Sequence, residues 1–152
     1  MALTIVDGWN PLGDRPPGND DQVFELLTAA VFQARFRPGI VKMRWPSIRR
    51  GFAEFDLATV AAWPEEKSAE LLSVEGMIRN PKKIRATLRN ARELKRRSNQ
   101  SGSALAYLRS FRDDEALVLD IDTWAHYIGA PSIRWFVRAL RGEARAAFNA
   151  QD

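Results

Sequence analysis

The apolar residues that follow the first 19 positions recur at helical spacing along most of the chain, and this periodicity restricts the fold more than any other feature. Phe24, Leu27 and Val31, for example, lie three and four positions apart, as on one buried face of a helix. Alternating apolar and polar residues, which mark strands, are almost absent, and the best such segment covers residues 115–121. The sequence therefore predicts an all-α protein with seven or eight helices.

Capping residues and prolines divide this helical pattern into segments. Asp56 precedes an apolar run, where its side chain can accept hydrogen bonds from the first free N–H groups of a helix, and Ser101 and Ser103 flank Gly102 before another such run. Pro64 and Pro81 fit first helical turns, where the N–H that proline lacks is not needed. We expect helices over residues 20–36, 46–52, 57–63, 64–74, 81–97, 104–111, 122–128 and 132–148, the first capped by Asp20 or Asp21.

Length and composition bound the domain organisation and the possible cofactors. At 152 residues one domain is the default, so we expect an arm over residues 1–19, rich in Gly and Pro, and a single helical domain over residues 20–148. The chain has no cysteine, and His126 is its one histidine, which excludes disulfides and zinc sites built from these residues. We expect no metal and no cofactor.

The same inspection gives expectations about location. No apolar run approaches the ~18 residues that a membrane span needs, and the first residues carry an acid rather than a basic leader. We therefore expect a cytoplasmic protein that does not contact membranes, and a monomer.

Basic residues are concentrated in two stretches of the chain. Between Arg79 and Arg112 there are eleven Lys and Arg residues and one acid, Glu93, and between Arg35 and Arg50 there are six bases and no acid. Such segregation favours a basic face for a polyanion, most naturally nucleic acid. The alternative is that these side chains are simply solvated on the surfaces of long helices.

Four short motifs follow one another along residues 19–111. They read NDDQVFELL with FQA over 19–34, FAEFD with a following VA over 52–61, GMIRNPKKIRATLRNAR over 76–92, and GSALAYLRSF over 102–111. In order and spacing they resemble the DNA-3-methyladenine glycosylase I family, within the helix-hairpin-helix DNA glycosylase superfamily. The resemblance implies two small helical lobes, with the first helix packed near the last. It also implies a base-excision enzyme that flips a damaged base and hydrolyses its N-glycosidic bond.

The segment YIGAPSIRWFVRAL, residues 127–140, resembles a helix-hairpin-helix. In that interpretation Gly129 permits the tight turn, and Ser132 caps a helix whose first N–H groups bind a phosphate of double-stranded DNA. The expected DNA contacts are Gly129, Pro131, Ser132, Arg134, Arg138, Arg79 and Lys83. The alternatives are an ordinary helix–helix turn, a solvated Arg stripe, and a merely structural role for the residues that begin the helix after Asn80.

Two departures from the family concern recognition of the base. With Gln33 fixing the alignment, the Glu with which the family reads an alkylated base falls on Ala30, and a stacking Trp of the family falls on Pro38. A cationic methylated purine is attracted by a carboxylate and by aromatic faces, so both losses should weaken its recognition. The catalytic residue stays unknown, and the Cys and His ligands of the family's zinc site are also missing. The chain thus looks like a divergent member.

The remaining pocket residues follow from the same alignment. We expect a base pocket formed by Trp9, Ala30, Gln33, Pro38 and Trp45. The Gly-Leu of the family, whose Leu enters the space left by the flipped base, becomes Arg35-Phe36, and Phe36 is a plausible wedge because apolar and aromatic side chains both unstack DNA. The alternative is that Phe36 belongs to the core. We expect His126 to be structural rather than catalytic.

Three functions stay open at this point. The first is a DNA glycosylase with an altered substrate. The second is a noncatalytic DNA-binding or lesion-sensing protein on the same scaffold, which the loss of the family's Glu favours. The third is a domain whose basic face binds an acidic protein. The sequence does not decide whether the chain is an enzyme, although the resemblance favours one.

Overall fold

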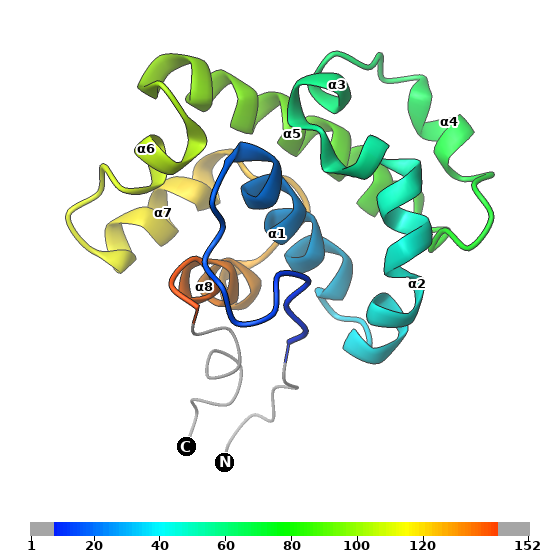
Figure 1. Cartoon of the computed structure of the whole chain (residues 1–152), viewed down its shortest axis with the longest axis horizontal. Coiled ribbons are helices and arrows are strands. Elements are labelled where there is room, and N and C mark those ends of the chain that lie inside the picture. Colours follow the sequence, from blue (N-terminus) through cyan, green and yellow to red (C-terminus); the bar gives the residue numbers. More distant parts are fainter. Residues whose placement is uncertain (1–7, 143–152) are drawn as a thin grey trace.

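Helix α1 (Asp20–Gln33) lies at the centre of the computed structural model, which describes residues 8–142 (Figure 1). The other helices are α2 (Pro38–Gly51), α3 (Leu57–Ala61), α4 (Lys67–Leu71), α5 (Pro81–Ser101), α6 (Ala104–Leu108), α7 (Asp114–Trp124) and α8 (Ala130–Ala139), with a 3-10 turn η1 (Ala53–Phe55). No strand occurs within residues 8–142, which confirms the all-α prediction. In that part of the chain, none of the helices combines the length and the apolar character needed to cross a membrane.

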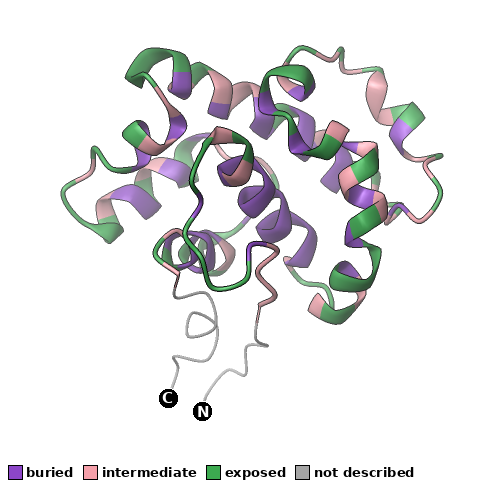
Figure 2. Cartoon of the chain, viewed as in Figure 1, coloured by how far each residue is buried: buried purple, intermediate pink, exposed green. Residues whose placement is uncertain are grey.

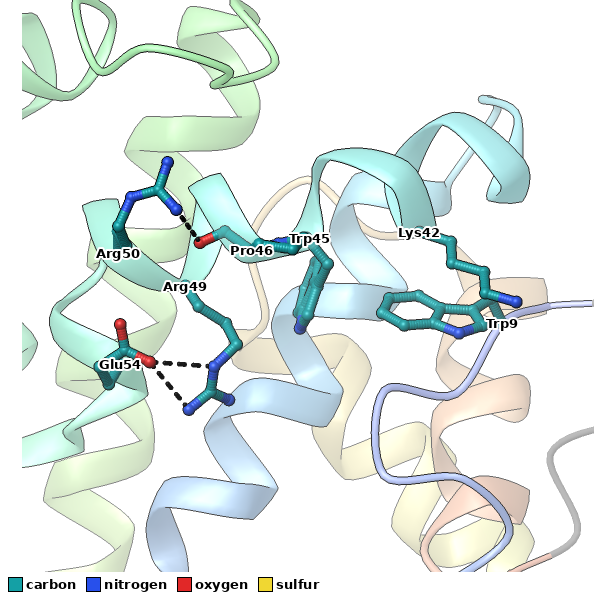
Figure 3. A pocket seen from close by; sticks show the side chains of 7 residues that line it. All are labelled: Trp9, Lys42, Trp45, Pro46, Arg49, Arg50 and Glu54. Carbon is teal, nitrogen blue, oxygen red and sulfur yellow. Dashed lines mark hydrogen bonds and ion pairs between the residues drawn. The ribbon is translucent and has the colours of Figure 1, made fainter.

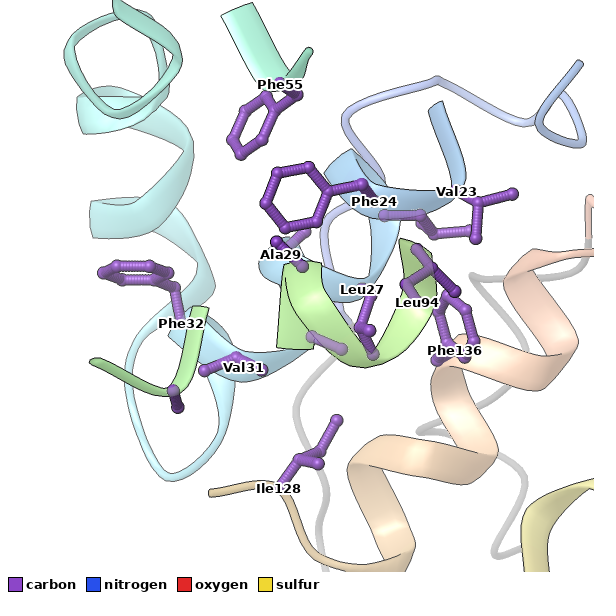
Figure 4. Close-up of a cluster of buried hydrophobic side chains, with 14 of the residues drawn as sticks. Val23, Phe24, Leu27, Ala29, Val31, Phe32, Phe55, Leu94, Ile128 and Phe136 are labelled. Atoms are coloured by element: carbon purple, nitrogen blue, oxygen red, sulfur yellow. The ribbon is translucent and has the colours of Figure 1, made fainter. Parts of the chain in front are cut away.

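Helix α1 is buried on all its sides, not along a single apolar stripe. Every residue from Val23 to Gln33 is buried, as the continuous purple of this helix in Figure 2 shows. Helices α2, α5, α6 and α8 all contact it, and Figure 4 shows its side chains gathered with Leu94 of α5 and Phe136 of α8. The single apolar stripe expected from the sequence is therefore only part of the buried surface, because α1 has neighbours on several sides.

Three consecutive polar residues at the start of α1 each bind a different part of the chain. Asn19, not Asp20 or Asp21, is the cap, and its side chain accepts a hydrogen bond from the Gln22 N–H at 2.9 Å. Asp20 instead accepts hydrogen bonds from Ser98 Oγ and from the Ala104 N–H, while Asp21 accepts one from the Leu57 N–H. The acids thus bind α1 to the starts of α3 and α6.

Two groups of helices flank α1. Helices α2, α3 and α4 lie on one side and α6, α7 and α8 on the other, and α5 runs past both groups (Figure 1). Helix α5 contacts α1, α3, α4 and α6, and α1 contacts α8. The two lobes and the packing of the first helix against the last were both expected.

Several predicted helix boundaries were wrong. Helix α2 begins at Pro38 instead of Pro46, because Pro38 fits the first turn and Val41, Trp45 and Ile48 continue one buried face on either side of Pro46. The strand-like residues 115–121 belong to α7, whose buried residues Leu117, Val118, Ile121 and Trp124 have helical spacing. The helix expected over 122–128 therefore ends at Trp124, and His126 lies in the following turn.

The last helix also differs from the prediction. Helix α8 begins at Ala130 rather than Ser132 and ends at Ala139. The expected continuation is wrong for residues 140–142, which form a turn, while residues 143–148, including Arg145 and the expected end of the domain, lie outside the described residues.

The carboxyl end of α1 is bound by a lysine from a distant helix. Lys83 of α5 is only 5% exposed, and its ammonium donates to the Phe32 carbonyl at 2.7 Å and the Ala34 carbonyl at 2.9 Å. The last carbonyls of a helix have no partner within it, and a cation is favourable beside them. Desolvation nevertheless lowers the pKa of Lys83 from 10.5 to about 8.

Replacement of a leucine inside α1 should destabilise the fold strongly. Leu27 is fully buried, so Leu27→Ala should lower the free energy of unfolding by about 2–5 kcal/mol, since it removes buried methyl groups and leaves a cavity. Leu119→Ala is the matched control, because Leu119 is 61% exposed and its loss should change stability by less than about 0.5 kcal/mol. Urea unfolding followed by circular dichroism measures both, and equal effects would contradict the central position of α1.

The lowered pKa of Lys83 predicts how stability depends on pH. Below pH 8 the folded and unfolded states both hold the proton, so the cost of burying the charge is fully present. Between about pH 8 and 10.5 the folded state loses the proton first, and stability should rise with pH. The free energy of unfolding of the wild type, relative to Lys83→Met, should therefore increase by at most about 3 kcal/mol over this interval. With the exposed Lys82→Met as control, a constant or falling difference would contradict the assignment.

Candidate functional site

An aromatic hollow lies between the N-terminal arm and α2 (Figure 3). Its volume is about 500 Å³, and it is lined by Trp9, Lys42, Trp45, Pro46, Arg49, Arg50 and Glu54. The rings of Trp9 and Trp45 meet edge to face with their centroids 5.3 Å apart. The structure thus brings together the two tryptophans that the sequence placed in a base pocket. We call this space the aromatic hollow.

Gln33 holds Trp9 in place through the backbone. Its Oε1 accepts a hydrogen bond from the Trp9 N–H at 2.6 Å, and its Nε2 donates to the Trp9 carbonyl at 2.9 Å and to the Ala29 carbonyl at 3.0 Å. The amide is buried at the end of α1, and these three partners are all backbone groups. Gln33 therefore positions a wall of the aromatic hollow without lining it.

The other wall is held by a buried carboxylate. Glu25 Oε2 accepts hydrogen bonds from Trp45 Nε1 at 2.8 Å and from Arg49 Nη1 at 2.7 Å. Arg49 also pairs with Glu54 at 3.0 Å, which is the dashed contact in Figure 3. Both carboxylates at this end of α2 therefore share one guanidinium as their ion-pair partner.

The other two cations of the hollow have no acidic partner among the described residues. Arg50 donates to Ser47 Oγ at 3.1 Å and to the Pro46 carbonyl at 3.4 Å, and no ion pair of Lys42 is found. The charged side chains of the aromatic hollow that remain available to contact a ligand, Lys42 and Arg50, are therefore positive. This balance opposes the binding of a cation and suits a neutral or anionic ring.

A left-handed turn places Glu54 at the hollow. Ala53, Glu54 and Phe55 all have φ between +54° and +61°, a conformation that costs about 1–2 kcal/mol per residue without glycine. The buried Phe55 ring offsets this strain, since it stacks on Trp45 at 5.3 Å and on Phe52 at 6.1 Å. Sequence reasoning missed this turn because no Gly or Asn marks it.

Besides Gln33, two further expected pocket residues do not line the aromatic hollow. Ala30 is 1% exposed and faces the core, and Pro38 begins α2. The hollow is formed by Trp9 and the later turns of α2. The positions at which the family resemblance placed a carboxylate and a stacking Trp thus carry neither function here.

Phe36 lies at the surface and not in the core. It is 39% exposed and borders a second hollow of about 370 Å³, together with Ile40, Arg44, Gly76, Met77, Ile78 and Arg79. The preceding residue, Arg35, has φ +54°. Glycine adopts this left-handed conformation most readily, which explains why the family resemblance puts a glycine at this position. Residues 34–37, here called the wedge loop, therefore present one aromatic ring between two arginines.

The turn between α7 and α8 is fastened to α5. Asn90 accepts a hydrogen bond from the His126 N–H at 2.7 Å and donates to the His126 carbonyl at 3.3 Å. Gly129 is the cap of α8 with an ordinary φ of −95°, and the left-handed residue is the exposed Tyr127 at φ +59°. Our expectation that Gly129 provides the unusual turn conformation was wrong.

The first turn of α8 has no side-chain cap. Ser132 lies inside the helix and does not cap it, and Pro131 occupies the first turn. The N–H groups at this end are thus not covered by a capping side chain, which is the arrangement that binds a phosphate.

The arginines of α8 differ in their surroundings. Arg134 forms a double hydrogen bond to Glu115, with distances of 2.7 and 3.2 Å, and Arg141 pairs with Asp114 at 2.6 Å. Arg138 is exposed, and among residues 8–142 no ion pair of its guanidinium is found. Of the two α8 arginines expected to contact DNA, Arg138 is therefore the less committed to an internal partner.

Helix α5 connects the separate parts of the site, which contact it at successive positions along its length. The exposed Arg79 precedes its first turn, Lys83 lies under the wedge loop, and Asn90 holds the turn at His126. Seven residues of helix separate Lys83 from Asn90, which is about 10 Å along the axis. Lys83 itself is directed at the end of α1 and not at solvent, although the sequence suggested it as a DNA contact.

Comparison with known proteins agrees with this architecture. The chain resembles the solved structure of 3-methyladenine DNA glycosylase I from Staphylococcus aureus, with a TM-score of 0.71 and 15% identity over 89% of this chain and 81% of that one. A second crystal structure of a 3-methyladenine DNA glycosylase I gives 0.67 and 21% over 86% and 81%. A solution structure, described as showing a novel mode of alkylated base recognition, gives 0.68 and 23% over the same shares.

These likenesses establish a shared fold. The sequence itself matches the family model for methyladenine glycosylases over residues 13–130, which is well over half of the chain. The protein belongs to the methyladenine glycosylase family.

Proposed function

We propose that this protein is a DNA-repair glycosylase that binds double-stranded DNA, flips one nucleotide and cleaves the N-glycosidic bond of a base other than a cationic methylpurine. The observation that carries the proposal is the aromatic hollow, where Trp9 and Trp45 meet edge to face and the nearby carboxylates of Glu25 and Glu54 both pair with Arg49. Family membership supports the glycosylase class, and the charge of the hollow supports the altered substrate.

The parts of the site divide the reaction between them. The uncovered first turn of α8 binds a phosphate, and Phe36 enters the stack where the nucleotide has left. The flipped base then enters the aromatic hollow and stacks on the partly buried Trp9, because Trp45 is 4% exposed and one of its faces is covered by Phe55. The bond between the base nitrogen and the C1′ carbon of the sugar breaks, a water oxygen bonds to C1′, and the proton of water ends on the departing base.

The charges of the hollow decide the class of base. A methylated purine cation is stabilised by a carboxylate, but Glu25 and Glu54 both pair with Arg49, and Ala30 supplies none. Lys42 and Arg50 would repel such a cation. A neutral base, or a bulkier one that uses the tryptophan faces, meets none of these costs.

A noncatalytic lesion-sensing protein is the second candidate. The observation that favours it is the same pairing of Glu25 and Glu54, because a carboxylate held by a guanidinium is a weak base for activating water. A glycosylase assay over a panel of damaged bases, run beside binding to a duplex with an abasic site, separates the two. Binding without release of any base would favour the sensor.

Duplex binding should depend steeply on salt. Each phosphate neutralised contributes a slope of about −0.9 to the log–log plot of affinity against salt. Arg138→Ala and Arg79→Ala should each lower affinity for all sequences alike and reduce the magnitude of the slope by about one. Arg112→Ala is the matched control, because Arg112 is equally exposed but lies at the far end of α7 from the turn at 125–129. Fluorescence anisotropy measures this, and binding that ignores salt would contradict the proposal.

The protein should release little or no 3-methyladenine from DNA. A charge-assisted hydrogen bond contributes about 1.5–3 kcal/mol, so its absence lowers recognition roughly ten- to 150-fold. Chromatography of bases released from methylated DNA measures this, with an abasic duplex confirming that the preparation binds DNA. Robust release of 3-methyladenine would show that another residue reads the base.

A further inference from the structure

We propose that Lys83 is the positioning residue for the DNA wedge, because its ammonium fixes the end of α1 and so holds the wedge loop with Phe36 outward. This inference rests on the proposed function, in which Phe36 enters the DNA stack. It concerns a residue that would otherwise be assigned to phosphate binding.

The contacts of Lys83 are unusual for a lysine. Its ammonium is buried under the wedge loop, bound to the Phe32 and Ala34 carbonyls, and lies 5.0 Å from the centre of the Phe36 ring. Within residues 8–142 no carboxylate pairs with it. Burying a charge without a counterion is unfavourable, and the lowered pKa of Lys83 reflects that cost. The bonds it makes are therefore specific to this loop.

The wedge loop needs an external hold. Arg35 occupies the left-handed region without being a glycine, which is a strained conformation. The loop itself supplies the bond from the Phe36 N–H to the Gln33 carbonyl at 3.0 Å and those from the Ala34 N–H to α1. Lys83 adds hydrogen bonds to the Phe32 and Ala34 carbonyls, where the Arg35 turn begins. It lies about 50 positions away from them in the sequence.

The result is a ring presented at one fixed place. Phe36 borders the second hollow beside Arg44 and Arg79, where a DNA backbone would be attracted. The ammonium under the ring attracts its π face, an interaction that strengthens away from water. Loss of Lys83 should therefore leave DNA affinity nearly intact while the wedge no longer enters the stack efficiently.

The experiment separates binding from flipping. A duplex carrying 2-aminopurine beside an abasic site reports unstacking by fluorescence, and a fluorescein label reports affinity by anisotropy. Lys83→Met should lower the 2-aminopurine signal at saturation by about fivefold or more, with affinity within about twofold. Lys83→Arg should retain much of the signal because it keeps a cation, and the exposed Lys82→Met is the matched control. Circular dichroism selects a temperature at which every variant is folded.

A double-mutant cycle tests the link to Phe36. If Lys83 acts through the wedge, Phe36→Ala and the Phe36→Ala, Lys83→Met pair should give the same low signal. Arg35→Gly should restore part of the signal in Lys83→Met, since glycine adopts the left-handed turn without strain. That rescue keeps the test informative if Lys83→Met folds poorly on its own.

The failures are distinguishable. Normal flipping by Lys83→Met, or additive losses in the double mutant, would overturn the role of Lys83 while the proposed function stands. If the wild type binds duplex but gives no 2-aminopurine signal, both the wedge and its positioning residue are wrong.

Discussion

The fold depends on burying one helix on several sides. Because α1 is covered by α2, α5, α6 and α8, its polar ends must be satisfied by groups from other parts of the chain. Asp20 and Asp21 bind the starts of α6 and α3, and at the other end Gln33 and Lys83 bind the arm and the end of α1. The same bonds that allow the burial of α1 therefore set the walls of the site.

The last turn of α1 connects two functions in opposite directions. Gln33 reaches the backbone of Trp9 and so shapes the aromatic hollow, while the Phe32 and Ala34 carbonyls bind Lys83 and so fix the wedge loop. In the proposed function, the hollow that receives the base and the ring that enters DNA would therefore both be positioned by one helix end. This favours a device in which nucleotide flipping and base recognition occur in a fixed relative geometry.

The sequence predicted the fold class and the family but not the connections. Periodicity, a cap such as Asp56 and a first-turn proline such as Pro81 are local signals, and they placed most helices. The start of α2 was predicted too late, at Pro46, and the start of α8 too late, at Ser132. The roles of Gln33 and Lys83 depend on partners 24 and about 50 positions away, and no local pattern reveals such partners.

Strain in this protein is found beside its candidate site. The left-handed residues Ala53, Glu54 and Phe55 form the turn that brings Glu54 to the aromatic hollow, and Arg35 lies in the wedge loop. Each conformation costs free energy that helix packing alone does not require, and each is held by a buried aromatic stack or a buried charge. A carboxylate presented by such a turn is useful only if a ligand can meet it, yet Glu54 meets Arg49. The turn therefore places Glu54 against the guanidinium of Arg49. In the proposed function, this guanidinium occupies the position beside the carboxylate that a cationic base would need.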